Sequence, residues 1–376
     1  MNFTIVCDVL GKVNNGTTLA TLNLIHHLEK RGHQVTVVSP DTSTEGEEHY
    51  YVVPTLNLGK KLNGYLAKNG VSLARADEDI LRESMANADV VHVQMPLFLG
   101  CRAVKIAREM GKPITASFHC QAENITAHVG MMNCSPVNHM VYHTFYKKLY
   151  RYCDKVHYPT EFIREVFEDA TDKTNAVVIS NGVDEMFFQP MEHKKVCDKF
   201  VVVCSGRYSR EKAQWQLLEA VSKSRHKDEI KVVLAGCGPF DNSLRQQAEK
   251  LGVDCEMRFF TRPQLIKLFH CADLYVHTAL IEIEAIACME ALVSGLVPVI
   301  CNSERSATRY FALDEKNLFE PENIEDLRDK IDFWLEHPEV KAEYEKKYHE
   351  ASQDFALNAC MMKMEKMLIS AAEEKK

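Results

Sequence analysis

Two acidic residues, Glu282 and Glu290, flank an apolar stretch that follows a β-like run at 274–277. We expect this stretch to be helical, which would place the two carboxylates up to ~12 Å apart at about 1.5 Å per residue. That span matches the distance from a hexose to the ribose of a nucleotide diphosphate sugar, and carboxylates accept hydrogen bonds from hydroxyl groups. Glu282 is therefore a candidate ligand of the sugar and Glu290 of the ribose. An acidic pair that only caps and flanks a core helix explains the spacing equally well.

A basic pair, Arg207 and Lys212, lies in the loop SGRYSREK at 205–212, after a predicted strand. A guanidinium and an ammonium group that converge there suit a diphosphate and stabilise charge on a leaving group. The competing interpretation is a solvated basic turn. The backbone is predicted to come close to the same ligand at two glycine turns and at the start of the predicted helix that Glu282 opens. The residues are Gly206, Gly236, Ile283, Glu284, Ala285 and Ile286.

The N-terminal half offers candidate residues for a second substrate. Asn15 and Gly16 lead into a helix whose exposed amides attract negative charge, so Gly16 is predicted to touch both substrates. His119 ends a predicted strand and has the chemistry to orient an acceptor hydroxyl or move a proton, and Asn124 follows in the same loop. An ordinary strand-to-helix turn and a structural histidine bonded to backbone are the alternatives.

Short apolar runs alternate with helical periodicity, which is typical of parallel sheets covered by helices. Periodicity is lost near 181–195, where we place a hinge. The sequence therefore predicts an α/β protein of two Rossmann-like, doubly wound domains that face a central cleft. The predicted domains are 1–185 and 196–355, with a final helix at 356–376 packing back on the first. The predicted strands are 3–7, 35–39, 90–93, 114–118, 199–204, 231–235, 274–277 and 297–301.

Composition limits the class of protein. The 376 residues are 46% hydrophobic and 26% charged, an ordinary globular balance. No apolar run approaches the ~20 residues that span a bilayer, and the first residues read as a strand, so we expect a cytoplasmic protein. The thirteen cysteines form no CxxC pair and are predicted to be reduced, and a net charge of −8 argues against a nucleic-acid partner.

Taken together, these blocks resemble glycosyltransferase family 4, a retaining family with the GT-B fold. The resemblance runs through RGHQVTVV at 31–38, ADVVHVQMP at 88–96, KPITASFHC at 112–120, ISNGVD at 179–184, AGCGP at 235–239 and SGLVPVI at 294–300. It implies that Arg207 and Lys212 grip the donor diphosphate, that Glu282 contacts the sugar and Glu290 the ribose, and that His119 lies near the reacting centre. It also implies a hexosyltransferase that needs no cofactor or catalytic metal, and no metal-ligand spacing stands out in the sequence.

A weaker resemblance, carried by NNGTT at 14–18 and ENIT at 123–126, points to the subgroup that glucosylates diacylglycerol. The same half has two basic segments that could form an amphipathic surface. One holds Lys60 and Lys61, and the other is a predicted helix with Tyr142, Tyr146, Lys147, Lys148, Tyr150 and Arg151. Tyrosine and lysine together suit a membrane interface, and anionic lipid attracts such residues. A helix with a core stripe and a solvated face is the alternative.

We therefore predict a retaining glycosyltransferase that moves a hexose from a nucleotide sugar such as UDP-glucose to a lipid acceptor such as diacylglycerol. It would act at the cytoplasmic face of the membrane, as a peripheral protein. One alternative keeps the fold and changes the acceptor to a soluble or polyprenyl-linked sugar. Another is a nucleotide-sugar-binding subunit of low activity, which the charge of Glu284 beside a diphosphate favours.

Overall fold

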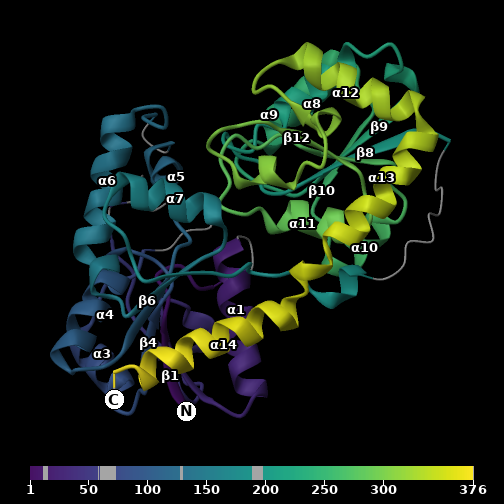
Figure 1. Cartoon of the computed structure of the whole chain (residues 1–376). Helices are drawn as coiled ribbons and strands as arrows, with labels where there is room; N and C mark the ends of the chain where they lie inside the picture. The colour runs from purple at the N-terminus through teal and green to yellow at the C-terminus, as the bar shows by residue number, and fades with distance from the viewer. Residues whose placement is uncertain (12–15, 58, 60–72, 128–129, 189–197, 376) are drawn as a thin grey trace. The chain divides into compact units, whose positions relative to one another are not determined.

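The computed structural model describes residues 1–376 except 12–15, 58, 60–72, 128–129, 189–197 and 376. It divides into two compact units (Figure 1). Unit 1 comprises Met1–Asn181 and Asn358–Lys376, and unit 2 comprises Gly182–Leu357. The boundary at Asn181 falls at the start of the stretch where the sequence loses its periodicity.

Unit 1 is built on a seven-stranded sheet in the order β3-β2-β1-β4-β5-β6-β7, with every pair parallel. The order reverses between β1 and β4, and in open α/β sheets ligands bind outside the carboxyl ends of the strands at such a reversal. The strands are β1 (Asn2–Val6), β2 (Gln34–Ser39), β3 (Tyr50–Val52), β4 (Val90–Val93), β5 (Ile114–Ser117), β6 (Lys155–Tyr158) and β7 (Ala176–Val178).

Helices cover both faces of this sheet, with α1 and α14 on one side and α3 and α4 on the other (Figure 1). The C-terminal helix α14 is fixed by Glu365, whose buried carboxylate lies 3.0 Å from His27 Nε2, 2.9 Å from His33 Nε2 and 3.2 Å from Arg31 Nε. The helices are α1 (Gly16–Lys30), α3 (Glu78–Met85), α4 (Phe98–Glu109), α5 (Ala122–Thr126), α6 (Ser135–Lys148), α7 (Glu161–Ala170) and α14 (Leu357–Glu373).

Unit 2 repeats the plan with six parallel strands in the order β10-β9-β8-β11-β12-β13, and its order reverses between β8 and β11. The strands are β8 (Phe200–Ser205), β9 (Ile230–Ala235), β10 (Cys255–Arg258), β11 (Leu274–His277), β12 (Pro298–Cys301) and β13 (Leu318–Phe319). The helices are α8 (Trp215–Ser222), α9 (Asp241–Leu251), α10 (Arg262–Phe269), α11 (Ile286–Val293), α12 (Ile324–Glu336) and α13 (Pro338–Ala351).

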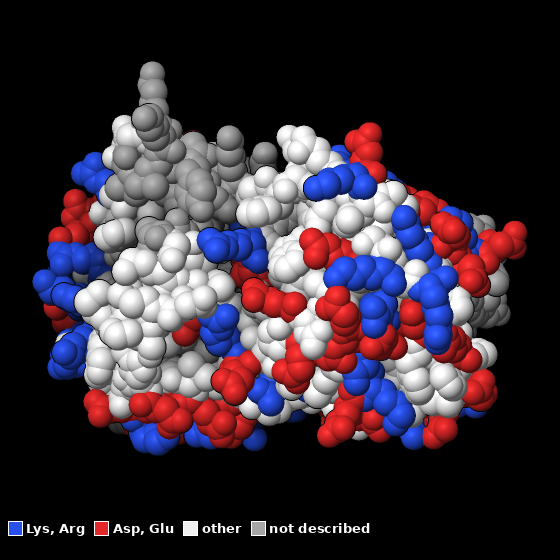
Figure 2. All heavy atoms as spheres, turned by 90° about the horizontal axis from the view of Figure 1, so that it is seen from above, with Lys and Arg blue, Asp and Glu red and all other residues white. Residues whose placement is uncertain are grey.

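The surface carries charges of both signs. In Figure 2, acidic and basic side chains are interspersed on the right and along the lower and left edges, and the left-centre is mostly uncharged. Within the part of the chain that the structure describes, no helix has the length and apolar character needed to cross a membrane.

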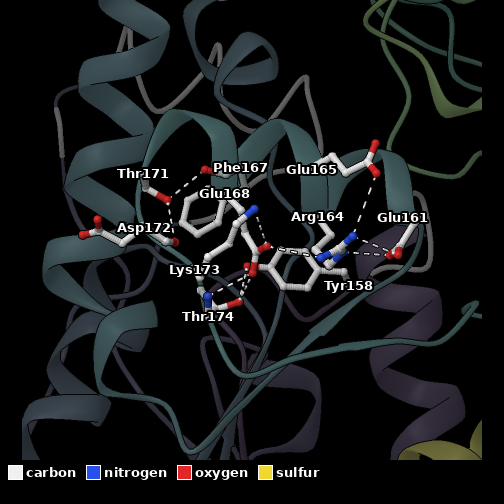
Figure 3. A network of polar contacts seen from close by, with 10 residues as sticks. All are labelled: Tyr158, Glu161, Arg164, Glu165, Phe167, Glu168, Thr171, Asp172, Lys173 and Thr174. Atoms are coloured by element: carbon white, nitrogen blue, oxygen red, sulfur yellow. Dashed lines mark hydrogen bonds and ion pairs between the residues drawn. The ribbon is translucent and has the colours of Figure 1, made fainter.

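A polar network around the buried Glu168 lies at the turn between α7 and β7 (Figure 3). The carboxylate of Glu168 accepts hydrogen bonds from the backbone N–H and the hydroxyl of Thr174, both at 2.9 Å. It also lies 3.3 Å from Arg164 Nη1 and 3.3 Å from Lys173 Nζ. Burial would raise the pKa of Glu168, but the bonds from Thr174 and the charge of Lys173 lower it below its usual value. Glu168 is therefore an ionised anchor for the last strand of unit 1.

Replacing Glu168 with alanine should destabilise the protein by about 2 kcal/mol or more, because the Thr174 N–H loses its acceptor and Lys173 loses its carboxylate partner, while Arg164 keeps Glu161 at 2.8 Å. Glu165→Ala is the matched control on the same helix, since its exposed carboxylate lies 3.9 Å from Arg164. We expect its effect to stay within about 0.5 kcal/mol. Denaturant unfolding of both variants measures the difference, and equal effects would contradict the anchoring role.

Candidate active site

The candidate site of unit 2 lies where the sheet order reverses. The loop after β8 supplies Arg207 and Lys212, and the loop after β11 supplies Glu282. The ammonium group of Lys212 donates a hydrogen bond to Glu282 Oε1, and His277 Nε2 lies 3.2 Å from the same oxygen. The Thr278 hydroxyl donates to the Lys212 carbonyl at 2.7 Å, which ties the two loops together. The reversal thus gathers a cation, an acid and an imidazole at one point.

Glu282 does not lie on a helix, so the prediction that both acids share one helix is wrong. Helix α11 begins at Ile286, and its N-cap Ala285 has a left-handed backbone with φ 64° and ψ 73°, which interrupts helical geometry. Glu282 instead forms a β-bridge with Ser306: its carbonyl accepts from Ala307 N at 2.9 Å, and its N–H donates to Arg305 O at 3.3 Å. The bridge, rather than helical spacing, sets the position of this carboxylate.

The charge of Glu282 is set by its neighbours. Burial alone would raise its pKa, but Lys212 and His277 lower it to about 2. Burial lowers the pKa of His277 below its ordinary value, although Glu282 opposes that shift. Both directions indicate an ionised carboxylate beside a neutral imidazole at neutral pH. The Tyr275 hydroxyl lies 3.2 Å from His277 Nδ1 and so holds the far side of the ring.

Arg207 is held by an acid from its own loop. Its Nη2 donates to Glu211 Oε1 at 2.9 Å, and the Ser209 hydroxyl donates to the same oxygen at 2.6 Å. Burial would raise the pKa of Glu211, but Ser209 and Arg207 lower it below its usual value. Glu211 and His277 were not among the predicted site residues, although Glu211 stands four residues from Arg207 and His277 ends the strand before Glu282. An incoming phosphate would compete with Glu211 for the guanidinium group.

Two glycines let the loops after β8 and β9 approach each other. Gly206 has a φ of 137°, a conformation that side-chain-bearing residues rarely adopt. A Cβ atom on Gly236 would lie 1.9 Å from the Gly206 carbonyl oxygen, so no larger residue fits without moving the backbone. Both predicted glycine positions therefore lie in one contact beside Arg207. Ile283 and Glu284 lie in the loop that leads to Ala285, with Glu284 buried and Ile283 half-buried.

Glu290 lies on α11 and is 7% exposed. Burial raises its pKa to about 7, although the nearby guanidinium of Arg262, at 3.4 Å from Glu290 Oε1, opposes that shift. Asp184 raises the pKa of Glu290 further. Glu282 and Glu290 thus differ in pKa, because Glu282 has a close ammonium partner and Glu290 a more distant guanidinium group.

In unit 1, His119 lies two residues after the end of β5 and is half-buried. Its ring centroid lies 5.9 Å from that of His157 in an edge-on arrangement. Burial, with smaller effects from His157 and His92, lowers the pKa of His119 well below its ordinary value. Gly16 is the first residue of α1 and Asn124 lies on α5, whereas Asn15 is outside the described residues.

Near His119, a series of buried hydrogen bonds connects the three strands β4, β5 and β6. His157 Nε2 donates to the Ile179 carbonyl at 2.6 Å, so its Nδ1 accepts from the Ser117 hydroxyl at 2.8 Å. Ser117 Oγ then accepts from His92 Nε2 at 3.0 Å. Burial lowers the pKa of His92 to about 3 and that of His157 to about 4, so both rings are neutral at neutral pH. The ring that His119 meets edge-on, that of His157, is therefore uncharged and held by hydrogen bonds on both of its nitrogens.

The predicted membrane surface is only partly exposed. Tyr142 and Tyr150 are buried in the core, so their assignment to that surface was wrong: Tyr142 donates to the buried Glu123 carboxylate at 2.7 Å, and Tyr150 donates to the Ser117 carbonyl at 3.1 Å. Tyr146 is half-buried, and three basic side chains are exposed, those of Lys147, Lys148 and Arg151. Lys60 and Lys61 lie outside the described residues.

Metal ligation has no candidate in the described part of the chain, where no three His, Cys, Asp or Glu side chains gather closely enough to hold an ion.

Substituting Gly236 with alanine should push the loops after β8 and β9 apart. We expect a loss of about 1–3 kcal/mol in stability, because the added methyl group meets backbone rather than a flexible side chain. Cys237→Ser, at the exposed neighbour in the same turn, is the control that should leave stability near that of the unsubstituted protein. Thermal unfolding compares the two, and a fully stable Gly236→Ala protein would show that this contact yields easily.

Comparison with known proteins gives consistent matches over both units. Residues 14–186 match Glycosyltransferase Family 4, and residues 186–354 match Glycosyl transferases group 1. The chain is 25% identical over 310 residues to alpha-monoglucosyldiacylglycerol synthase of Streptococcus pneumoniae, which covers 77% of this chain and 68% of that protein. It is 23% identical over 300 residues to a GDP-mannose-dependent alpha-mannosyltransferase of Mycobacterium tuberculosis, covering 76% and 75% of the two chains.

Among solved structures, Anabaena Alr3699/HepE in complex with UDP and glucose is 20% identical and has a TM-score of 0.75, with 98% of this chain and 99% of that chain covered. This agreement extends over both sheets and their helices. The chain belongs to the glycosyltransferases of family 4 and group 1, a hexosyltransferase with the GT-B fold of two parallel α/β units.

Proposed function

We propose that this glycosyltransferase moves glucose from UDP-glucose to a lipid acceptor such as diacylglycerol, with donor chemistry in unit 2 and the acceptor bound by unit 1. The observation that carries the donor assignment is the Lys212–Glu282–His277 cluster at the strand reversal, where Arg207 belongs to the same loop as Lys212. It combines an ionised acid, which suits sugar hydroxyls, with cations that suit a diphosphate.

The proposed reaction is a transfer with retention. The bond between the sugar C1 and the phosphate oxygen breaks while Arg207 and Lys212 stabilise the charge that builds on the departing nucleotide. The acceptor oxygen forms the new bond to C1 from the same face, and its proton passes to the leaving phosphate oxygen. Glu282 holds the sugar hydroxyls, and the α11 N-terminus contributes backbone N–H groups toward the phosphates.

His119 is proposed to orient the acceptor hydroxyl. A neutral imidazole can accept a hydrogen bond from that hydroxyl, whereas an imidazolium has no free lone pair. The lowered pKa of His119, caused first by burial, favours the neutral form. Gly16, Asn15 and Asn124 are proposed as further acceptor contacts from the same half of the chain.

The lipid acceptor has two supports. The alpha-monoglucosyldiacylglycerol synthase relative is named for a product in which glucose is carried by diacylglycerol. In this chain, Lys147, Lys148 and Arg151 lie exposed on and just after α6, and Met140 on the same helix is 62% exposed. Basic side chains beside an exposed apolar one suit the interface of an anionic bilayer.

Lys212→Ala should lower turnover with UDP-glucose by about 100-fold or more, because the leaving diphosphate loses a cation that acts mainly in the transition state. Lys223→Ala is the control in the same unit: this exposed lysine on the surface pairs with Glu325 and should leave turnover unchanged. Product formation by chromatography measures both. Unchanged turnover in a folded Lys212→Ala protein would remove the donor assignment.

Neutralising Lys147, Lys148 and Arg151 to glutamine should weaken binding to phosphatidylglycerol vesicles by about two orders of magnitude, at about 1 kcal/mol per charge. The control carries the same loss of charge at the exposed residues Lys30, Lys363 and Lys366 and should bind as before. Vesicle sedimentation gives the affinities. Failure of the unsubstituted protein to bind vesicles, together with transfer to a water-soluble sugar, would favour the soluble-acceptor alternative.

A further inference from the structure

Arg262 occupies a position in unit 2 that the proposed chemistry does not yet use. It is the first residue of α10, directly after the N-cap Thr261. The Thr261 N–H donates to Gln264 Oε1 at 3.0 Å, the Thr261 hydroxyl caps the helix in return, and Pro263 follows. A capping box and an N-terminal proline fix the backbone at this point, so the root of the Arg262 side chain is well defined.

The guanidinium group of Arg262 lies between two acids. Its Nη2 is 3.4 Å from Glu290 Oε1 on α11 and 3.9 Å from Asp184 Oδ2 in the segment before α8. Its Cζ lies 5.2 Å from the ring centroid of Phe187, whose carbonyl accepts a hydrogen bond from Ser294 at the end of α11. Arg262 therefore links three segments that surround one buried carboxylate.

Glu290 depends on this contact for its charge. A carboxylate that is nearly inaccessible to water becomes neutral unless a cation or strong donors compensate it. Arg262 is the cation that acts on Glu290, and Asp184 opposes it. The remaining titratable group bonded to α11 among the described residues is His349 of α13, which lies 3.2 Å from the Val293 carbonyl.

Arg262 also has one N–H group that can donate a hydrogen bond to a ligand. Its Nε–H is buried and has no acceptor among the described residues, although Glu290 lies beside the same guanidinium group. A ribose hydroxyl that donates to Glu290 can accept a hydrogen bond from a neighbouring N–H, since a hydroxyl both donates and accepts.

We propose that Arg262 is a positioning residue that keeps Glu290 ionised and oriented toward the ribose of the donor, so that unit 2 selects ribonucleotides over nucleotides that lack a ribose hydroxyl. The proposal rests on the proposed function, which places the ribose at Glu290. It concerns the charge and orientation of Glu290, whereas Arg207 and Lys212 act on the diphosphate.

The test compares binding of UDP and 2′-deoxyuridine diphosphate to the full chain by calorimetry, between about pH 5.5 and about pH 8.5. In the unsubstituted protein, UDP affinity should be about tenfold lower at one pH unit below the Glu290 pKa of about 7. Protonated Glu290 can no longer accept hydrogen bonds from both the 2′ and the 3′ hydroxyl of the ribose. UDP should bind about tenfold or more tightly than its 2′-deoxy form, because the deoxy ligand leaves a buried acceptor unpaired.

Arg262→Gln should move the midpoint of this pH dependence upward by about one unit or more and reduce the preference for UDP, and Arg262→Lys should restore part of both. Arg258→Gln is the matched control, since Arg258 lies four residues earlier, pairs with Glu256 at 2.9 Å and should change neither property. A folded Arg262→Gln protein with the original midpoint and preference would overturn the proposal.

A second measurement needs no nucleotide. A carboxyl whose folded pKa is raised holds its proton longer in the folded state, so stability falls as pH rises from the unfolded value toward about 7. The difference in the free energy of unfolding between the unsubstituted protein and Glu290→Gln should change with pH along this slope. Arg262→Gln should extend the slope to higher pH, and an unmoved slope would also overturn the proposal. Absence of UDP binding in the unsubstituted protein would instead remove the proposed function.

Discussion

An ionised carboxylate inside a folded domain must be compensated, and unit 2 is arranged around that requirement. Glu282 is almost entirely buried, yet its pKa lies near 2 because Lys212 and His277 outweigh the effect of burial. The compensation requires the loop after β8 and the strand β11 to meet, which they do because the sheet order reverses between them. The same meeting point carries Arg207. The proposed site for a negatively charged, hydroxyl-rich substrate thus depends on this compensation at the point where the sheet order reverses.

Backbone geometry provides the second half of the arrangement. Ala285 adopts a left-handed conformation that a side-chain-bearing residue rarely takes, and Gly206 and Gly236 meet at a distance that excludes a Cβ atom. Unusual backbone of this kind persists where the surrounding structure holds it in place. Here the bridge between Glu282 and Ser306 does so on one side. As a result, the position of Glu282 is set by its bridge to Ser306, and the start of α11 is set by the left-handed turn at Ala285.

The two units use the same sheet plan for different polar interiors. Unit 2 concentrates charge, with Lys212 and Glu282 in direct contact. Unit 1 has neutral groups near the carboxyl end of β5, where His92 and His157 are joined through Ser117 and the His157 ring meets that of His119 edge-on. Burial keeps both histidines uncharged, which suits recognition of a neutral hydroxyl better than recognition of a phosphate. This difference supports the proposal that unit 2 binds the donor and unit 1 the acceptor.

The sequence by itself determined the two parallel sheets and the residues at their carboxyl ends, because buried β-rich runs and helical periodicity are local patterns. Strands at 90–93 and 274–277 were predicted at their observed bounds, whereas β3, β6, β7, β10 and β13 were not predicted. Of these, β3, β7 and β13 have only two or three residues, and β6 and β10 mix charged or polar residues with apolar ones. Tertiary structure decided what local spacing could not. It placed Glu282 in a bridge rather than on α11, turned Tyr142 and Tyr150 into the core, and brought His277, Glu211 and Arg262 beside the predicted acids and cations. Those outcomes depend on contacts between residues distant in the chain or on which face of a helix meets its neighbour, and neither is encoded in periodicity alone.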